Sequence, residues 1–187
     1  MLKLTVVLPT YNRLYQLKSV LIGFEKQTYP LDQFEIIVVS DGSTDGTDEY
    51  LQTLQTPLQI KILRQQNGGA AAARNAGIEQ AASDLILFID DDVVPAPELI
   101  GEHMWIHENG EENIVVIGPM LTPPDYELKP WVAWEQTMLY KQYSALHAGD
   151  YEPTARQFYT GNTSLKRKWL QISGGFDTNF LRAEDVE

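Results

Sequence analysis

Short apolar runs alternate with longer amphipathic segments from the start of the chain to about residue 118. Five runs have the length and composition of buried strands, at residues 4–8, 35–40, 59–63, 85–89 and 114–117. Between the first two runs, apolar residues recur at helical spacing, at Leu14, Leu17, Leu21 and Phe24. Further helices are expected around residues 50–54, over 69–82 and from 97 to about 108. The alternation predicts an α/β fold with a mostly parallel central sheet and right-handed crossovers.

The pattern becomes less regular after Gly118. Prolines cluster between residues 119 and 130, an aromatic helix is expected over residues 131–145, and a strand near residues 163–166. We see no internal repeat and no linker. We therefore expect one domain, residues 1–187, with a regular nucleotide-binding-type part at 1–118 and a second part at 119–187.

Composition and charge narrow the class of protein. The chain has 187 residues, 43% hydrophobic and 21% charged, as in an ordinary globular domain. Its net charge of −12 argues against a nucleic-acid partner. The absence of cysteine excludes disulfides and thiolate metal sites. No apolar stretch reaches the ~20 residues that span a bilayer, and the first residues enter a strand with no signal peptide. We expect a cytoplasmic protein.

The acidic triplet Asp90-Asp91-Asp92 is the clearest chemical feature. It follows the apolar run at residues 85–89, at the end of a strand where parallel-sheet proteins bind ligands. Three neighbouring carboxylates repel one another unless a cation relieves them, so a hard divalent metal with oxygen ligands is expected. The alternative is a solvated turn with a helix cap.

Other polar segments follow the other strands and should meet the triplet at one edge of the sheet. Tyr11, after the first strand, offers a ring to a base, and Asp41, after the second, accepts hydrogen bonds from a base or a ribose. The small residues 68–73 let a ligand approach the backbone at a helix start, where Arg74 adds a fixed positive charge. Together these parts suit a nucleotide diphosphate with a metal bridging its oxygens.

Two further groups allow more than one interpretation. His103 and His107, one helical turn apart, form either a zinc-binding pair or a surface or core-edge pair, which we favour because the zincin glutamate is missing. Four aromatic residues either line a sugar-acceptor site or form a packed helix face: Trp131, Trp134, Tyr140 and Tyr143. The basic run at residues 166–168 is expected to be solvated.

In this order, the motifs resemble the family 2 glycosyltransferases. The matching segments are Val-Val-Leu-Pro-Thr-Tyr-Asn-Arg (6–13), Val-Val-Ser-Asp-Gly-Ser-Thr-Asp (38–45), Ala-Arg-Asn-Ala-Gly (73–77), Phe-Ile-Asp-Asp-Asp (88–92), Gly-Asn-Thr-Ser-Leu (161–165) and Gly-Gly-Phe-Asp…Glu-Asp (174–177, 184–185). The resemblance implies the GT-A nucleotide-diphospho-sugar transferase fold, with a Rossmann-like first half. Residues 1–118 would then bind the donor, and 119–187 would form an incomplete acceptor side.

The resemblance also implies a role for each matching residue. Thr10, Tyr11, Asp41 and Arg74 match positions that hold the nucleobase, usually uracil. Pro9, Arg13 and Asp91 are placed in the same donor site. Asp90 matches the position near the ribose and the metal, and Asp92 matches the ligand of Mn²⁺ or Mg²⁺. Asp185 matches the carboxylate proposed as general base.

The chemistry agrees with these roles. Negative charge grows on the departing diphosphate, and a divalent cation stabilises it as a Lewis acid. A carboxylate within ~3 Å of the acceptor hydroxyl takes its proton during attack. Attack opposite the leaving group inverts the anomeric centre without a covalent intermediate.

We therefore expect a metal-dependent, inverting transferase that uses a nucleotide-sugar donor, most often a UDP-sugar. Its acceptor would be a glycan or a lipid-linked molecule, in polysaccharide or cell-surface glycan synthesis, with peripheral association at the cytoplasmic face of the membrane. The chain ends two residues after Asp185, so transfer by it alone is expected to be poor. The alternatives are a non-catalytic nucleotide- or glycan-binding module and a sugar-phosphate nucleotidyltransferase. The latter is disfavoured because Pro-Thr-Tyr-Asn replaces a Gly-rich loop after the first strand.

Overall fold

A six-stranded sheet forms the centre of the described part of the chain. The computed structural model describes residues 3–123, 126, 128–154 and 157–180. Its strands are β1 (Leu4–Thr10), β2 (Phe34–Asp41), β3 (Ile60–Gln65), β4 (Leu85–Ile89), β5 (Val115–Ile117) and β6 (Asn162–Lys166), in the order β3-β2-β1-β4-β6-β5. Strands β1 to β4 pair in parallel, whereas β6 runs antiparallel to both β4 and β5. The predicted mostly parallel sheet is confirmed.

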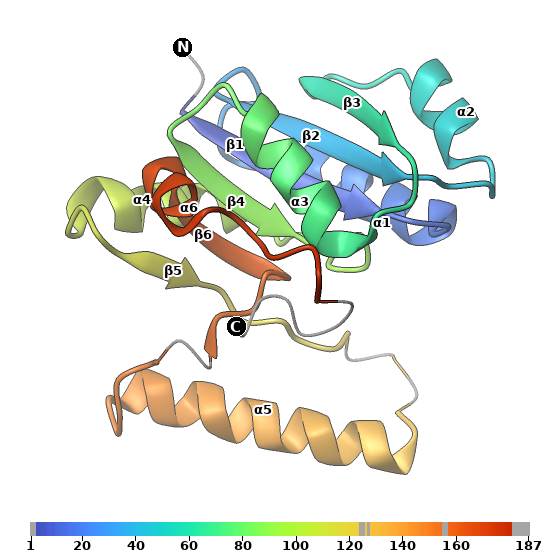
Figure 1. Cartoon of the computed structure of the whole chain (residues 1–187). Coiled ribbons are helices and arrows are strands. Elements are labelled where there is room, and N and C mark those ends of the chain that lie inside the picture. Colours follow the sequence, from blue (N-terminus) through green and yellow to red (C-terminus); the bar gives the residue numbers. More distant parts are fainter. Residues whose placement is uncertain (1–2, 124–125, 127, 155–156, 181–187) are drawn as a thin grey trace.

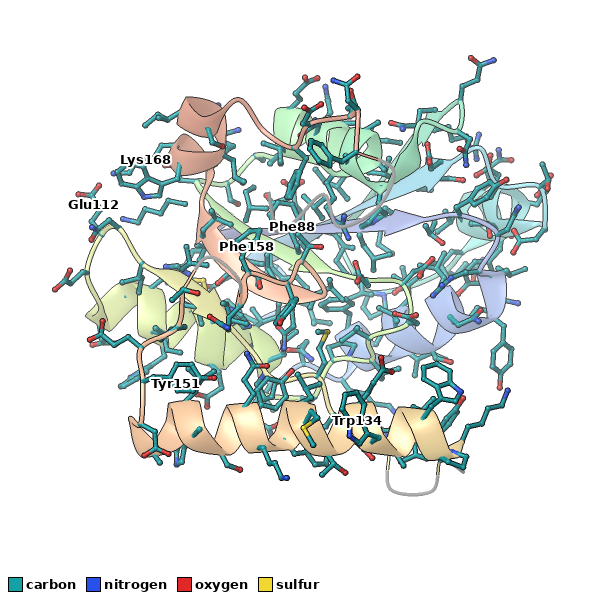
Figure 2. The ribbon with its side chains drawn as sticks, turned by 60° about the horizontal axis from the view of Figure 1, so that its bottom comes forward. Phe88, Glu112, Trp134, Tyr151, Phe158 and Lys168 are labelled. Atoms are coloured by element: carbon teal, nitrogen blue, oxygen red, sulfur yellow. The ribbon has the colours of Figure 1, made fainter. Side chains whose placement is uncertain are left out.

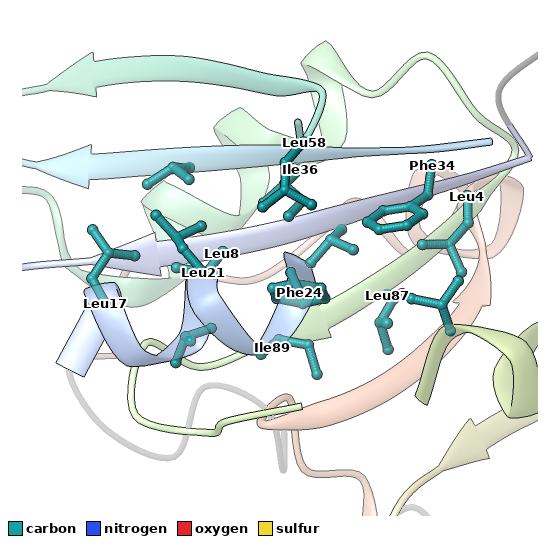
Figure 3. Packing of buried hydrophobic residues seen from close by; sticks show 14 of the residues in the cluster. Leu4, Leu8, Leu17, Leu21, Phe24, Phe34, Ile36, Leu58, Leu87 and Ile89 are labelled. Atoms are coloured by element: carbon teal, nitrogen blue, oxygen red, sulfur yellow. The ribbon is translucent and has the colours of Figure 1, made fainter. Parts of the chain in front are cut away.

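Helices cover both faces of this sheet (Figure 1). They are α1 (Leu14–Glu25), α2 (Thr47–Thr53), α3 (Gly69–Gln80), α4 (Leu99–Asn109), α5 (Pro130–Ala148) and α6 (Arg167–Ser173). One apolar cluster joins the sheet to α1, α2 and α4, and a second joins its other face to α3 and α6. Figure 3 shows the first cluster, with Phe24 of α1 packed among Leu8, Phe34 and Ile36.

The strand residues alternate between the two clusters, which explains the continuous apolar runs. In β1, Val6 and Leu8 belong to the first cluster and Val7 to the second. Gly77 of α3 lies directly on Val7, and a Cβ at this glycine would lie 2.4 Å from Val7 Cγ1. Helix α3, which follows the loop that contains Gly68, is therefore held close to the sheet.

The structure adds an element that was not predicted, the helix α6, which begins at Arg167 within the basic run. The three side chains of this run, expected to be solvated, are only partly exposed. The Arg167 guanidinium donates to the carbonyl of Ala81 at 2.6 Å, and Lys168 pairs with Glu112 (Figure 2). Helix α6 escaped prediction because only Leu170 is buried in its seven residues, which gives no periodic pattern.

Helix α5 lies apart from the sheet and has no buried residue (Figure 1). Trp131 and Trp134 are 62% and 64% exposed, so the interpretation as a packed helix face does not hold for them. One link to the rest is the phenol of Tyr143, which accepts a hydrogen bond from the backbone N–H of Met120 at 3.1 Å. None of the helices in the described ranges combines the length and apolar character needed to cross a bilayer.

Candidate functional site

A pocket of about 360 Å³ opens at the carboxyl ends of β1, β2 and β4. Every residue predicted for the donor and metal sites lines it, together with Ala70 and Ala73: Pro9, Thr10, Tyr11, Arg13, Asp41, Arg74, Asp90, Asp91 and Asp92. The structure thus brings together residues from four separate segments, as expected for the edge of a parallel sheet. Their individual roles stay predictions.

The loops after β1 and β2 are joined by side-chain hydrogen bonds. Asn12 adopts a left-handed backbone with φ 53°, and its side-chain oxygen accepts from the N–H of Thr44 at 2.7 Å. The Asn12 N–H donates to the hydroxyl of Ser43 at 3.1 Å. Asp45 accepts from the N–H of Leu14 at 2.9 Å, at the start of α1. These bonds hold the intervening Arg13 at the pocket edge.

Asp41 connects the end of β2 to the start of α3. It is 4% exposed, and its carboxylate accepts from the N–H of Gly68 at 2.8 Å and the N–H of Gly69 at 2.9 Å. The side chain of Gln65 donates to it at 2.8 Å. Three donors therefore already face this carboxylate, which has room for about one more. Asp41 shapes the loop beside the pocket as well as lining it.

The three carboxylates of the triplet have three different surroundings. Asp90 pairs with the buried Arg74 at 2.9 Å. Asp91 is buried and accepts from the hydroxyl of Thr10 at 2.7 Å, with Arg13 at 3.4 Å. Asp92 is half-exposed and pairs with the same guanidinium of Arg13. Burial raises the pKa of Asp91 to about 6, although the Thr10 hydrogen bond and Arg13 lower it. Asp91, the least defined of the three from sequence, is the buried anchor of the cluster.

The carboxylate oxygens of the pocket fit a divalent cation only if a bound substrate supplies the remaining metal ligands. Within the described ranges, no group of three or more histidine, cysteine, aspartate or glutamate side chains stands ready to hold a metal ion. Asp90 and Asp92 both face the pocket and offer carboxylate oxygens. Mg²⁺ is commonly bound by one or two carboxylates together with substrate phosphates. These residues therefore fit a metal that is shared with a diphosphate.

A second, larger groove of about 920 Å³ begins at Asp92 and was not predicted. It runs between α4, β5 and residues 117–123, and its lining is mainly apolar, with Tyr126 included. Asp92 lines both cavities, so a ligand in the groove lies next to the smaller pocket. The sequence signal was the proline-rich stretch after β5, which does not by itself indicate that it faces α4 across a groove.

The two histidines of α4 belong to a buried series of hydrogen bonds at the wall of this groove, which His103 and Asn162 line. His103 contacts the Ser164 hydroxyl through Nδ1 at 2.7 Å and the Asn162 side-chain oxygen through Nε2 at 3.0 Å. His107 Nε2 contacts the same hydroxyl at 2.8 Å. Since Asn162 donates its amide to the carbonyl of Pro119, its oxygen must accept from His103. The serine then donates to His103 and accepts from His107.

The burial of these two histidines predicts how the free energy of unfolding depends on pH. Burial lowers the pKa of His103 from 6.5 to about 4, so the unfolded chain takes up a proton in this range before the folded protein does. The stabilising contribution is therefore present above pH 6.5 and is lost as the pH falls toward 4. Between about pH 7.5 and about pH 5, the wild type should lose about 2 kcal/mol relative to His103→Gln.

Urea unfolding of the wild type and His103→Gln at both pH values measures this difference. Comparing two proteins is necessary because Asp91, whose pKa is raised, acts with the opposite sign in the same range. His107→Gln should change the pH dependence in the same direction as His103→Gln, because burial also lowers the pKa of His107. A constant gap between wild type and His103→Gln would contradict the assignment.

The segment after α6 is attached to α3 beside the pocket. The side chain of Asn75 donates to the carbonyl of Phe176 at 2.8 Å and accepts from its N–H at 2.9 Å. The Phe176 ring meets Phe88 edge-on, with ring centroids 5.4 Å apart, and lies beside Arg74. The chain is thus held beside the site up to this point. Asp185, the predicted general base, lies outside the described residues.

Comparison with known proteins bears directly on this geometry. A family model described as "Glycosyl transferase family 2" matches residues 5–175. Validoxylamine A glucosyltransferase from Streptomyces hygroscopicus subsp. jinggangensis is 31% identical over 212 residues, covering 98% of this chain and 50% of that protein. Poly(ribitol-phosphate) beta-N-acetylglucosaminyltransferase TarS of Staphylococcus aureus is 35% identical over 119 residues, covering 62% of this chain and 21% of TarS.

Solved structures share the fold. TarS 1–349 in complex with UDP superposes with a TM-score of 0.75 at 20% identity, covering 99% of this chain and 53% of that one. The mannosyltransferase PcManGT from Pyrobaculum calidifontis, in complex with GDP-Man and Mn²⁺, gives 0.74 at 23% identity, covering 98% and 50%. The present chain spans about half of the length of the glucosyltransferase, and the part of it that matches TarS in sequence spans about a fifth of TarS.

Proposed function

This chain belongs to glycosyl transferase family 2 and has the GT-A fold, and we propose that it binds a nucleotide-diphosphate sugar, preferably a UDP-sugar. In this proposal the sugar is transferred to an acceptor hydroxyl with inversion, and the nucleotide diphosphate leaves. The observation that carries this proposal is the convergence of the predicted donor residues around one pocket of about 360 Å³. Four chain segments meet there with a ring, a fixed arginine and several carboxylates, which are the groups that a base, a ribose and a metal-bound diphosphate require.

Each side chain has a part in this proposal. Tyr11 is 49% exposed and offers its ring to the base. Arg74, held by α3, is the fixed cation that helps to hold the base, and its partner Asp90 lies toward the ribose and the metal. Asp90 and Asp92 would hold Mn²⁺ or Mg²⁺, which stabilises the charge of the departing diphosphate when it is bound. Asp185 remains the proposed general base.

The groove next to Asp92 is the proposed acceptor site. Its position beside the donor pocket and its apolar lining with Tyr126 suit the faces of sugar rings or the apolar part of a lipid-linked acceptor. Relatives named for poly(ribitol-phosphate) and for validoxylamine A support a glycan-modifying role. We propose that the reaction takes place in the cytoplasm, at or near the membrane face, and a chain without cysteine forms no disulfide that would require an oxidising compartment.

Nucleotide binding tests the proposal. Isothermal calorimetry with UDP, GDP, CDP and dTDP, with and without Mn²⁺, should give the tightest binding for UDP with the metal. Asp92→Ala should remove the part of the affinity that depends on metal, about tenfold, as expected for one carboxylate ligand. Asp32→Ala, an exposed aspartate far from the pocket, is the matched control.

Two results would count against the proposal separately. If none of the four nucleotides binds, the donor site is wrong. If UDP binds equally well with and without Mn²⁺, and Asp92→Ala changes nothing, the metal role is wrong while the nucleotide site stands. Tight UDP binding without any sugar transfer, even in a chain extended at its end, would favour the non-catalytic binding module.

A further inference from the structure

Two arginines divide the three carboxylates of the triplet between them. Arg74 forms a salt bridge with Asp90, and Arg13 forms salt bridges with Asp91 and Asp92. Their surroundings differ, because the Arg74 side chain is 5% exposed and that of Arg13 is 47% exposed. Arg74 is thus a fixed part of the site, whereas an exposed ion pair such as Arg13–Asp92 is easily exchanged.

The surroundings of Arg13 allow its contact with Asp92 to break while its contact with Asp91 remains. Its backbone is held between the bonds from Asn12 and Leu14 to the loop after β2. Asp91 is buried and fixed by Thr10, so its contact with Arg13 does not depend on Asp92. Asp92 is 49% exposed and faces both cavities. The guanidinium can therefore leave Asp92 while it remains beside Asp91.

We propose that Arg13 is a placeholder cation that occupies Asp92 until a metal and a nucleotide diphosphate arrive together, and that it then turns from this carboxylate to the phosphate. This inference rests on the proposed donor function and assigns Arg13 a role that couples the two ligands. It is a positioning residue, because it controls when Asp92 is available.

The charges of the site explain why the two ligands would need each other. With all groups ionised, the triplet and its two arginines carry a single net negative charge, and the fourth carboxylate of the pocket, Asp41, is already engaged by three hydrogen-bond donors. The triplet therefore attracts a divalent cation only weakly. A metal alone must displace Arg13 and leave the guanidinium without a partner. A diphosphate supplies both the missing metal ligands and a new acceptor for Arg13, since guanidinium binds phosphate and carboxylate with the same planar geometry. Arg13 therefore favours the metal–nucleotide complex over either ligand alone.

Arg13→Gln separates this role from a purely structural one. Mn²⁺ alone, titrated by the electron paramagnetic resonance signal of the free ion, should bind about fivefold more tightly to the variant, because an exposed competing ion pair is removed. UDP in the presence of Mn²⁺ should bind about tenfold more weakly, because a charged hydrogen bond to phosphate is lost. Lys26→Gln, an exposed basic residue at the other end of α1, controls for the change in net charge.

The outcomes distinguish this inference from the proposed function. Opposite changes in the two affinities, with Lys26→Gln unchanged and Arg13→Lys between wild type and Arg13→Gln, support the placeholder role. Unchanged or weaker binding of Mn²⁺ alone to Arg13→Gln would overturn it, even if UDP binds the wild type well. If UDP does not bind the wild type, the proposed function fails, and the Mn²⁺ titration without nucleotide still decides the role of Arg13. Thermal unfolding of each variant shows whether the fold is intact.

Discussion

Replacing Asp41 with alanine should lower the free energy of unfolding by about 3–4 kcal/mol and weaken nucleotide binding about a hundredfold. The buried carboxylate accepts hydrogen bonds from the N–H groups of Gly68 and Gly69 and from Gln65. Without it, two backbone donors at the start of α3 lose their acceptor, and the favourable charge at this helix end disappears. Urea unfolding and UDP calorimetry measure the two effects.

Two further variants separate the causes. Asp41→Asn keeps one acceptor oxygen but turns an amide donor toward a backbone N–H, so we expect about half of the stability loss. Asp32→Ala removes an equal charge at an exposed position on the way to β2 and should leave both measurements unchanged. If Asp41→Ala keeps its stability and loses only UDP, the carboxylate serves the ligand alone and the structural role is wrong.

The parallel part of the sheet could be predicted because its strands are buried on both faces. Strand β4 has the predicted bounds, Leu85–Ile89, and all five residues are buried. A continuous apolar run between polar turns is unambiguous in such a case. The antiparallel direction of β6 and the short α6 could not be predicted in this way. Pairing direction leaves no period in the sequence, and neither does a helix in which only Leu170 is buried.

The sequence was enough to predict which residues lie together in the site, but not which of them contact one another. The rule that ligands lie beyond the carboxyl ends of parallel strands was enough to bring Thr10, Asp41 and Asp90 to one pocket. It says nothing about which side chains pair. Arg13 lies 79 residues from Asp92, and His103 lies 59 residues from Asn162. Such pairs depend on the final packing, as does the groove between α4 and β5.

Asn75 joins the donor side to the segment that leads to the proposed base. Its two hydrogen bonds reach Phe176 across 101 residues of sequence. The preceding Gly175 has φ +80°, and a Cβ there would lie 2.6 Å from the Asn75 side-chain oxygen. The glycine, the asparagine and Phe176 thus form one tight contact next to Arg74. Displacing this contact should disturb the acceptor side before it disturbs the bound nucleotide.

Asn75→Leu, which preserves the size of the side chain, should reduce sugar transfer about a hundredfold while UDP affinity stays within about twofold. A displacement of about 1 Å in the segment that leads to the proposed general base is enough for such a loss. Initial rates of transfer with saturating donor, paired with UDP calorimetry, measure the two quantities. Hydrogen exchange should also show faster opening at the N–H of Phe176, which loses its acceptor.

Two further variants in α3 test whether Asn75 acts through its contact with Phe176. Glu79→Ala alters an exposed residue of the same helix and should leave transfer and binding at wild-type values. Asn75→Asp keeps the acceptor for the Phe176 N–H but places a carboxylate oxygen against its carbonyl, so it should fall between Asn75→Leu and the wild type. If UDP affinity drops as far as transfer in Asn75→Leu, the residue acts by holding α3 and Arg74 in the donor pocket, and the link to the acceptor side is wrong.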